Sequence, residues 1–215
     1  MSQNNLTYEL KEPMITIEKF KYYITHMNNM ILNINKIKIL NEFAKDYHSR
    51  IYGREIAKKL KMNQKTVSNV LNELEKEHIL RYKVEGKNKY YYLNEFYPYL
   101  KEVIKLIEIQ KKIDFLENYK KLNEIFSKLE EKTEGILVIF GSYADFTATK
   151  NSDLDVFVIG QIKEAEDLED LYKIKINIVK LNNKTKFDKN NHLIKEIIKN
   201  HIILKGTGGF IELLW

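Results

Sequence analysis

The feature that most constrains the fold is an apolar run that ends at a Gly-Ser pair and is followed by two spaced aspartates. All five residues of Ile136–Phe140 are apolar, which is typical of a strand buried on both faces. Ten residues separate Gly141-Ser142 from Asp153–Ile159, a second strand-like stretch that Gly160 ends. Successive side chains of a strand point to opposite faces, so the two aspartates of Asp-Leu-Asp are expected on the same face.

These residues have the chemistry of a site for a metal-bound triphosphate. Carboxylates at positions i and i+2 of a strand lie roughly 7 Å apart at their Cα atoms, and Asp153 and Asp155 can therefore converge on one hard cation. Gly141 lets a phosphate approach the backbone, and the Ser142 hydroxyl with the following N–H groups can hold its oxygens. A short helix over Tyr143–Phe146 would add the partial positive charge of its N-terminus.

The spacing and surroundings of these residues are similar to those of a known family. The stretch GSYADFTATKNSDLDVFVIG resembles the signature of the polymerase-beta-type nucleotidyltransferases, and especially of their small members, the minimal nucleotidyltransferases. The similarity covers residues 117–215. It implies Mg²⁺ as cofactor and an NTP, most simply ATP, as substrate or ligand. It also implies nucleotide binding by Gly141, Ser142, Asp153 and Asp155, with both aspartates as catalytic and metal-binding residues.

The chain departs from that family where a third acid is expected. In the family, a carboxylate from a later strand completes a two-metal site and helps to activate the attacking hydroxyl. The candidate strand is Lys173–Leu181, with Ile174, Ile176 and Ile178 on one face and Lys175, Asn177 and Val179 on the other. Asn177 stands at the acidic position, and an amide is neither a base nor an anion. Nucleotide binding with one metal is expected to survive, whereas transfer should weaken.

Phe146 is a second departure, because many relatives have glycine at this point after the Gly-Ser turn. The phenylalanine either reshapes the loop over the phosphates or caps a core. The acids between Glu164 and Asp170 are expected to form the solvated face of a helix.

The positive charge of the protein is concentrated ahead of this region. The chain has 36 Lys+Arg and 30 Asp+Glu, and residues 33–95 contain 14 of the former and 8 of the latter, so the whole net charge of +6 lies there. A localised basic excess is the electrostatic footprint of a polyanion-binding module. A solvated lysine-rich surface is the alternative that charge alone leaves open.

Residues 35–95 have the order of elements of a winged helix-turn-helix domain. A periodic helix from Asn35 is followed by an extended piece at Arg50–Tyr52, a helix over Arg54–Lys61, a second helix over Gln64–Glu77 capped by Asn63, and strands at Arg81–Val84 and Lys89–Leu93. The turn at Glu85–Asn88 is a hairpin signal. In the run Tyr90–Tyr92, the central residue points either inward or outward.

This segment resembles the winged helix-turn-helix domains of archaeal and bacterial transcription regulators, which implies DNA as a partner. The second helix would place its exposed polar side chains in the major groove, and the hairpin would contact the flanking phosphate backbone. The candidate DNA-binding residues are Lys65, Ser68, Asn69, Asn72, Lys87 and Lys89.

The stretch Tyr99–Lys132 is almost free of helix breakers and keeps helical periodicity. A break near Glu117–Tyr119 would separate a linker helix from the first helix of the next domain. The linker helix either pairs two subunits into a homodimer or packs within its own monomer.

The sequence thus predicts an α/β (α+β) protein of several parts. These are a lead-in over residues 1–34 with a short helix at Thr16–Met27, a winged helix domain over 35–95, a linker helix over 96–116, and a nucleotidyltransferase-like domain with a mixed sheet over 117–215.

The composition excludes several classes of site. Because the chain has no cysteine, disulfides, thiolate metal sites and cysteine catalysis are ruled out. The five histidines are scattered without zinc-ligand spacing, and His78 and His201 are expected to be packing or helix-terminus residues. No apolar run approaches the roughly 20 residues that span a bilayer, and the N-terminus has no secretory signal. A cytoplasmic protein without a membrane partner is therefore expected.

Three functions are compatible with these features. The first is a DNA-binding regulator that carries a nucleotidyltransferase-like module. The second is an enzyme that transfers a nucleotidyl group to a protein, RNA or small-molecule hydroxyl, with the winged helix recruiting substrate or regulating expression as in antitoxin-like relatives. The third is a degenerate domain that senses nucleotide or holds a partner. The aspartate pair supports the second function, and Asn177 supports the third.

Overall fold

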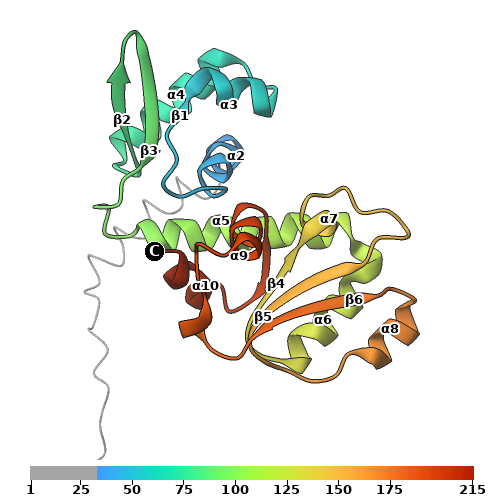
Figure 1. The fold of residues 1–215 in the computed structure, drawn as a ribbon. Helices are drawn as coiled ribbons and strands as arrows, with labels where there is room; N and C mark the ends of the chain where they lie inside the picture. The colour runs from blue at the N-terminus through green and yellow to red at the C-terminus, as the bar shows by residue number, and fades with distance from the viewer. Residues whose placement is uncertain (1–32) are drawn as a thin grey trace, which may run out of the picture.

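The computed structural model describes residues 33–215. The helix predicted at Thr16–Met27 lies outside the described residues. Within them, the chain forms a helical region with a hairpin and, below it in Figure 1, a four-stranded sheet flanked by helices. No helix of the described part combines the length and the apolar character that a membrane span requires.

The first region confirms the predicted order of a winged helix. Its elements are α2 (Ile34–Phe43), β1 (Ile51–Tyr52), α3 (Gly53–Leu60), α4 (Gln64–Lys76), β2 (Leu80–Glu85) and β3 (Asn88–Leu93). The strand β3 lies between β1 and β2 and pairs with both of them antiparallel. The hairpin of β2 and β3 projects away from the rest of the molecule (Figure 1).

Local side-chain chemistry explains where the helix α4 begins and which face it buries. The Asn63 side chain accepts a hydrogen bond of 2.8 Å from the Lys65 backbone N–H, as predicted for an N-cap. Four apolar residues at helical spacing are buried, namely Val67, Val70, Leu71 and Leu74. The predicted polar face of α4 is left exposed to solvent.

Tyr91 resolves the two orientations that the sequence left open for the tyrosine run. Its ring is buried against the helices, and its hydroxyl donates a hydrogen bond of 3.2 Å to Asn72 Oδ1. The turn between the strands contains Gly86 with φ 62°, a left-handed conformation that glycine adopts without strain. The hairpin is therefore attached to α4 by a buried aromatic residue.

The long helix α5 (Leu100–Asn118) connects the two regions and ends where the sequence predicts a break. A short 3-10 turn (Lys120–Leu122) leads into α6 (Asn123–Lys132). The helix α5 buries Leu100, Val103, Ile104, Ile107 and Phe115 within its own chain. It also exposes Ile109 and Ile113. The helix thus packs within the monomer, and the homodimer stays a prediction.

The second region is built on a mixed sheet, as predicted. Its strands are β4 (Thr133–Phe140), β5 (Leu154–Ile162), β6 (Ile176–Leu181) and β7 (Ile202–Lys205), in the order β6-β5-β4-β7. The strand β4 pairs antiparallel with β5 and β7, whereas β5 and β6 are parallel. The remaining elements are α7 (Gly141–Ala144), α8 (Glu166–Tyr172), a 3-10 turn (Lys184–Lys186), α9 (His192–Lys199) and α10 (Thr207–Leu214).

Each face of the sheet has its own hydrophobic core. On one face, α6, α8 and the end of α5 cover residues such as Leu137 and Val156. On the other face, α9 and α10 cover residues such as Val138 and Phe157, and this core continues without interruption into the winged helix region as far as Phe43. The two regions therefore share one core, and the predicted domain boundaries stay predictions.

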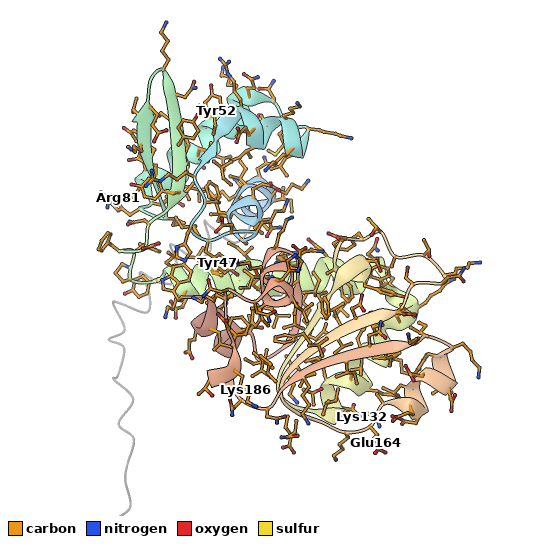
Figure 2. All side chains as sticks on the ribbon, in the orientation of Figure 1. Tyr47, Tyr52, Arg81, Lys132, Glu164 and Lys186 are labelled. Atoms are coloured by element: carbon orange, nitrogen blue, oxygen red, sulfur yellow. The ribbon has the colours of Figure 1, made fainter. Side chains whose placement is uncertain are left out.

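A buried charged cluster lies where the two regions meet. Tyr47, labelled in Figure 2, belongs to the loop after α2 and donates a hydrogen bond of 3.0 Å to the Glu108 carboxylate of α5. Lys111 donates to the same carboxylate at 2.8 Å, and His201 Nε2 lies 3.3 Å from it. Glu108 and His201 are each only 1% exposed. The cluster joins three parts of the chain that are far apart in sequence.

His201 is also a helix-terminus residue, as predicted. Its Nδ1 lies 3.1 and 2.9 Å from the carbonyl oxygens of Ile197 and Ile198 at the end of α9. Because carbonyl oxygens only accept, Nδ1 must carry a proton. The other ring nitrogen, Nε2, faces the Glu108 carboxylate. Burial alone raises the pKa of that carboxyl, but the positive charges of Lys111 and His201 outweigh burial and lower the pKa to about 2.

Candidate functional site

The Gly-Ser pair and the aspartates meet at one end of the sheet. Strand pairing places Phe140, the last residue of β4, opposite Asp155 of β5. Gly141 follows with φ 67°, and a Cβ atom at this position would overlap the Asp155 carboxylate. Only glycine fits a position with both a left-handed backbone and so close a neighbour. The glycine is therefore needed to accommodate Asp155.

The loop after Gly141 differs in detail from its prediction. The short helix α7 begins at Gly141 and ends at Ala144, two residues earlier than expected at each end. Phe146 lies beyond it with φ 59°, a left-handed conformation in which a helix does not continue. The Ser142 carbonyl accepts N–H groups of Thr147 and Ala148 at 3.0 and 3.1 Å, which folds the loop back over α7.

Phe146 caps an aromatic cluster, which is the second of the two roles left open for it. Its ring stacks on Tyr119 with centroids 6.1 Å apart and an angle of 10°, and it meets Phe115 edge-on at 6.3 Å. Tyr119 in turn contacts Tyr143 at 5.2 Å. A left-handed backbone is strained for a bulky residue, and these ring contacts offset part of the strain.

Asn177 lies beside both aspartates. The parallel register pairs it with Asp155. Its amide nitrogen donates a hydrogen bond of 3.3 Å to Asp153 Oδ2 and one of 3.0 Å to Asp155 Oδ1. The two carboxylates thus converge on one polar group, as the alternation of β5 predicts. The group is a neutral amide donor at the position where the resemblance implies an acid.

A lysine adds a positive charge to the same site. Lys175 Nζ lies 3.3 Å from Asp153 Oδ2, and both side chains are partly exposed. The sequence places Lys175 on the face of Asn177, but its contact with Asp153 follows only from the strand register. Across residues 33–215, no three His, Cys, Asp or Glu side chains gather in a way that could hold a metal ion. Two carboxylates and one ammonium leave a formal charge of about −1 on this cluster at neutral pH.

Asp153, Asp155 and Asn177 are the residues here that could hold a divalent cation. Both carboxylates converge on the Asn177 amide, so a Mg²⁺ ion could lie among the three side chains. Rotation of the Asn177 amide by half a turn presents its Oδ1 in place of Nδ2. Asp153, Asp155 and Asn177 would then supply three oxygen ligands, with waters in the remaining positions.

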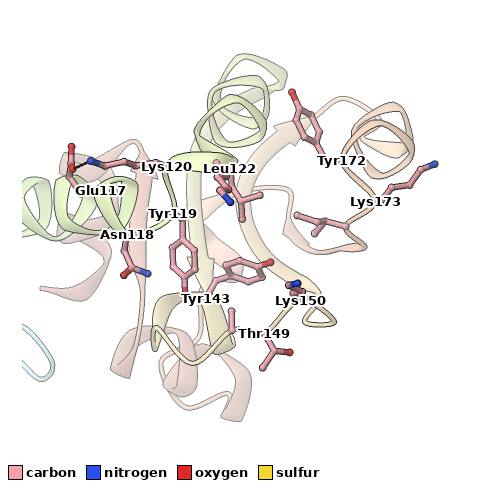
Figure 3. Close-up of a pocket in the computed structure, with 13 residues that line it drawn as sticks. Glu117, Asn118, Tyr119, Lys120, Leu122, Tyr143, Thr149, Lys150, Tyr172 and Lys173 are labelled. Atoms are coloured by element: carbon pink, nitrogen blue, oxygen red, sulfur yellow. Dashed lines mark ion pairs between the residues drawn. The ribbon is translucent and has the colours of Figure 1, made fainter.

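A cavity of about 690 Å³ opens between the turn from α5 to α6 and the loop that precedes β5 (Figure 3), and neither the Gly-Ser pair nor the aspartates line it. Tyr119 and Tyr143 lie at its centre, and Lys150 and Lys173 line it near the starts of β5 and β6. Burial raises the pKa of both tyrosine hydroxyls. The sequence signalled only the break near Tyr119, because the lining residues come from separate segments without a shared pattern.

The predicted DNA-binding side chains are exposed, and they lie on two elements. The exposed set comprises Lys65, Ser68, Asn69 and Asn72 on α4, with Lys87 and Lys89 on the hairpin. Two of them make contacts that the sequence did not predict. Asn72 accepts the hydrogen bond from Tyr91, and Lys89 Nζ lies 4.1 Å from the centre of the Tyr82 ring. The first contact joins α4 to the hairpin, and the second lies within the hairpin between β3 and β2.

The fold joins a helical domain with a β-hairpin to a domain built on a four-stranded mixed sheet. The family model described as winged helix-turn-helix DNA-binding matches residues 32–81, and the family model of the nucleotidyltransferase domain matches residues 119–205. The chain therefore carries a winged helix-turn-helix domain followed by a nucleotidyltransferase domain, in the predicted order.

Comparison with individual proteins adds little to the two family matches. No curated protein matches the chain. Among solved structures, the AntR antimony-specific transcriptional repressor is 21% identical, with a TM-score of 0.38, over 48% of this chain and 90% of the AntR chain. At this TM-score, the two structures share only part of their backbone fold.

Proposed function

We propose that the protein binds DNA through its winged helix domain and binds one Mg²⁺–NTP, most simply Mg²⁺–ATP, at Asp153 and Asp155 without efficient nucleotidyl transfer. The proposal of nucleotide binding without efficient transfer rests on the Asn177 amide, which donates hydrogen bonds to both carboxylates where a third acid was expected. The proposal of DNA binding is supported by the match to the winged helix-turn-helix family model and by the exposed polar face of α4.

In this proposal, different residues bind the metal ion and the phosphates. Asp153 and Asp155 hold the cation, which neutralises charge on the triphosphate. The Ser142 hydroxyl and the backbone around Gly141 hold phosphate oxygens. Transfer also requires a group that takes the proton of an attacking hydroxyl, and a second metal that stabilises the leaving oxygens. The amide of Asn177 cannot take a proton, and the ammonium of Lys175 disfavours a second cation at Asp153.

The second candidate is an active transferase with a protein or RNA acceptor. It is favoured by the presence of both aspartates and by the close approach of the Asp155 carboxylate to Gly141. In this case Asp153 and Asp155 are catalytic residues, and Asn177 has only slowed the reaction.

Isothermal titration of the full chain with ATP, with and without Mg²⁺, tests nucleotide binding. Saturable binding that depends on Mg²⁺ is expected, and Asp155→Ala should weaken it at least about tenfold because one of two charged ligands is lost. Asp170→Ala is the matched control, since it removes an exposed carboxylate of α8. Binding that is equal in wild type and Asp155→Ala would remove the proposed site.

The salt dependence of DNA affinity tests the winged helix. Lys65→Ala and Lys87→Ala should each weaken binding to all sequences and should each reduce the slope of log K against log salt by about 0.9, because one phosphate contact is lost. Fluorescence anisotropy with a labelled duplex measures both effects. Lys163→Ala, which removes an exposed lysine of the sheet domain, should change neither. DNA binding that is insensitive to salt would refute the electrostatic role of these lysines.

A further inference from the structure

A second cavity lies at the junction of the two regions, away from the aspartate pair. Its volume is about 370 Å³, which is within the range of pockets that hold small ligands. One wall is the loop that follows α2 in the winged helix region, and the other is formed by α9 and the end of α10. A molecule in this cavity would contact both regions at once.

The cavity is rich in positive charge. Four lysines line it, namely Lys45, Lys189, Lys195 and Lys199, and Asp46 is the one acid among its lining residues. Lys45 is neutralised by Glu42 at 2.6 Å, and Lys189 donates to the Leu214 carbonyl at 2.8 Å. Two of the four lysines therefore already have partners in the structure.

Lys195 and Lys199 are the lysines that remain available for an anion. They are four residues apart on α9 and therefore lie on one face of that helix. Both are exposed, and neither forms an ion pair among the residues that the structure describes. Two neighbouring ammonium groups repel each other, and a bound anion would remove that repulsion.

The remaining walls are apolar and held in place. Ala44 and Leu214 are nearly fully buried, and Ile198 packs against the same core between the two lysines on α9. Tyr47 completes the wall, and its hydroxyl is fixed by the hydrogen bond to Glu108. Apolar walls add affinity for a ligand with an apolar body and add nothing for a bare phosphate.

We propose that this cavity binds a small organic anion. Its phosphate or carboxylate group would lie on Lys195 and Lys199, and its apolar body would lie between Ile198 and Leu214. The ligand would touch the winged helix loop and the nucleotidyltransferase domain together. This site uses none of the residues proposed to bind Mg²⁺–NTP.

The single tryptophan of the chain is a natural reporter for this site. The Trp215 ring lies 5.6 Å from the Tyr47 ring and 5.9 Å from the His48 ring, measured between centroids. Both of these residues line the cavity. Binding there changes the surroundings of Trp215, whereas the aspartate pair lies on other elements.

Titration of the full chain with phenyl phosphate, followed by Trp215 fluorescence, tests the proposal. A saturable change is expected, with weaker binding of inorganic phosphate because it lacks the apolar body. The double variant Lys195→Ala/Lys199→Ala should weaken phenyl phosphate binding at least about tenfold, since hydrogen bonds to charged groups are lost. The control Lys163→Ala/Lys180→Ala removes two exposed lysines of the sheet domain and should bind as wild type does.

The outcomes separate this site from the proposed nucleotide site. Asp155→Ala should keep the phenyl phosphate response, even if it loses Mg²⁺–ATP. The proposal is overturned if the fluorescence change does not saturate, or if the Lys195→Ala/Lys199→Ala variant binds phenyl phosphate as wild type does. Equal binding of inorganic phosphate and phenyl phosphate would overturn it as well, because the apolar walls would then have no role.

Discussion

Replacing Glu108 by alanine is expected to reduce the free energy of unfolding by about 3–5 kcal/mol, the usual cost of removing one partner of a buried charge cluster. The loss leaves Lys111 and the buried His201 without their carboxylate and leaves the Tyr47 hydroxyl without its acceptor. Urea denaturation, followed by circular dichroism, measures the change. Because the cluster joins both regions, one cooperative transition should shift as a whole.

Glu102→Ala is the matched control for that variant. Glu102 lies on the same helix, but its ion pair with Lys105 is partly exposed, and such pairs contribute at most about 1 kcal/mol. Glu108→Gln keeps the shape and an acceptor for Tyr47, so it should fall between wild type and Glu108→Ala. A loss for Glu108→Ala no larger than for Glu102→Ala would contradict a stabilising role of the cluster.

The same carboxylate gives the stability a defined pH dependence. Its pKa is about 2 in the folded protein, below the ordinary value of 4.5, so the folded state prefers the ionised form. The contribution to stability is therefore complete above pH 4.5 and is lost as the pH falls toward 2. Accordingly, the difference in unfolding free energy between wild type and Glu108→Gln should shrink across that interval.

Replacing Asn177 by aspartate is expected to raise the affinity for Mg²⁺ at least about tenfold, because ligand charge strongly controls the binding of hard cations. The variant exchanges a hydrogen-bond donor for a third carboxylate beside Asp153 and Asp155. Without metal the three negative charges repel one another, so the midpoint of thermal unfolding should fall. Added Mg²⁺ should restore it by binding the folded state.

Asn182→Asp is the matched control for this second variant. It adds the same charge at an exposed position just after β6, next to the same strand but outside the aspartate cluster. It should change Mg²⁺ affinity by less than about twofold, since exposed charges are screened. If Asn177→Asp and Asn182→Asp behaved alike in Mg²⁺ titrations followed by thermal unfolding, the one-metal site would be wrong.

Much of the site could be predicted from the sequence because its signals are local. The apolar run before Gly141 and the alternation around Asp155 each depend on side-chain period within one strand, and the structure has both strands. The face that Asn177 of β6 shares with Lys175, the residue just before the strand, was predictable for the same reason. The helix α7 lies two residues earlier than predicted, and Phe146 after it combines a left-handed backbone with a ring contact to Phe115 of α5, which its local sequence does not reveal.

Contacts between segments that are distant in the sequence could not be predicted. The pairing of Asp155 with Asn177 sets the distance from Lys175 to Asp153, and strand register is not encoded in either strand alone. Glu108 has the pattern of an ordinary surface residue of a helix, yet it is buried against Tyr47 from 61 positions earlier in the chain. The continuous core between the two regions arises in the same way.

Incorporation of label from α-labelled ATP into protein or RNA acceptors, with Mg²⁺ present, tests the central claim most directly. Wild type should bind ATP in the titration but should transfer no more label than Asp153→Ala does, because Asn177 supplies neither a base nor a negative charge. Transfer by wild type that clearly exceeds the Asp153→Ala background would contradict the claim. The nucleotidyltransferase domain would then be an active enzyme.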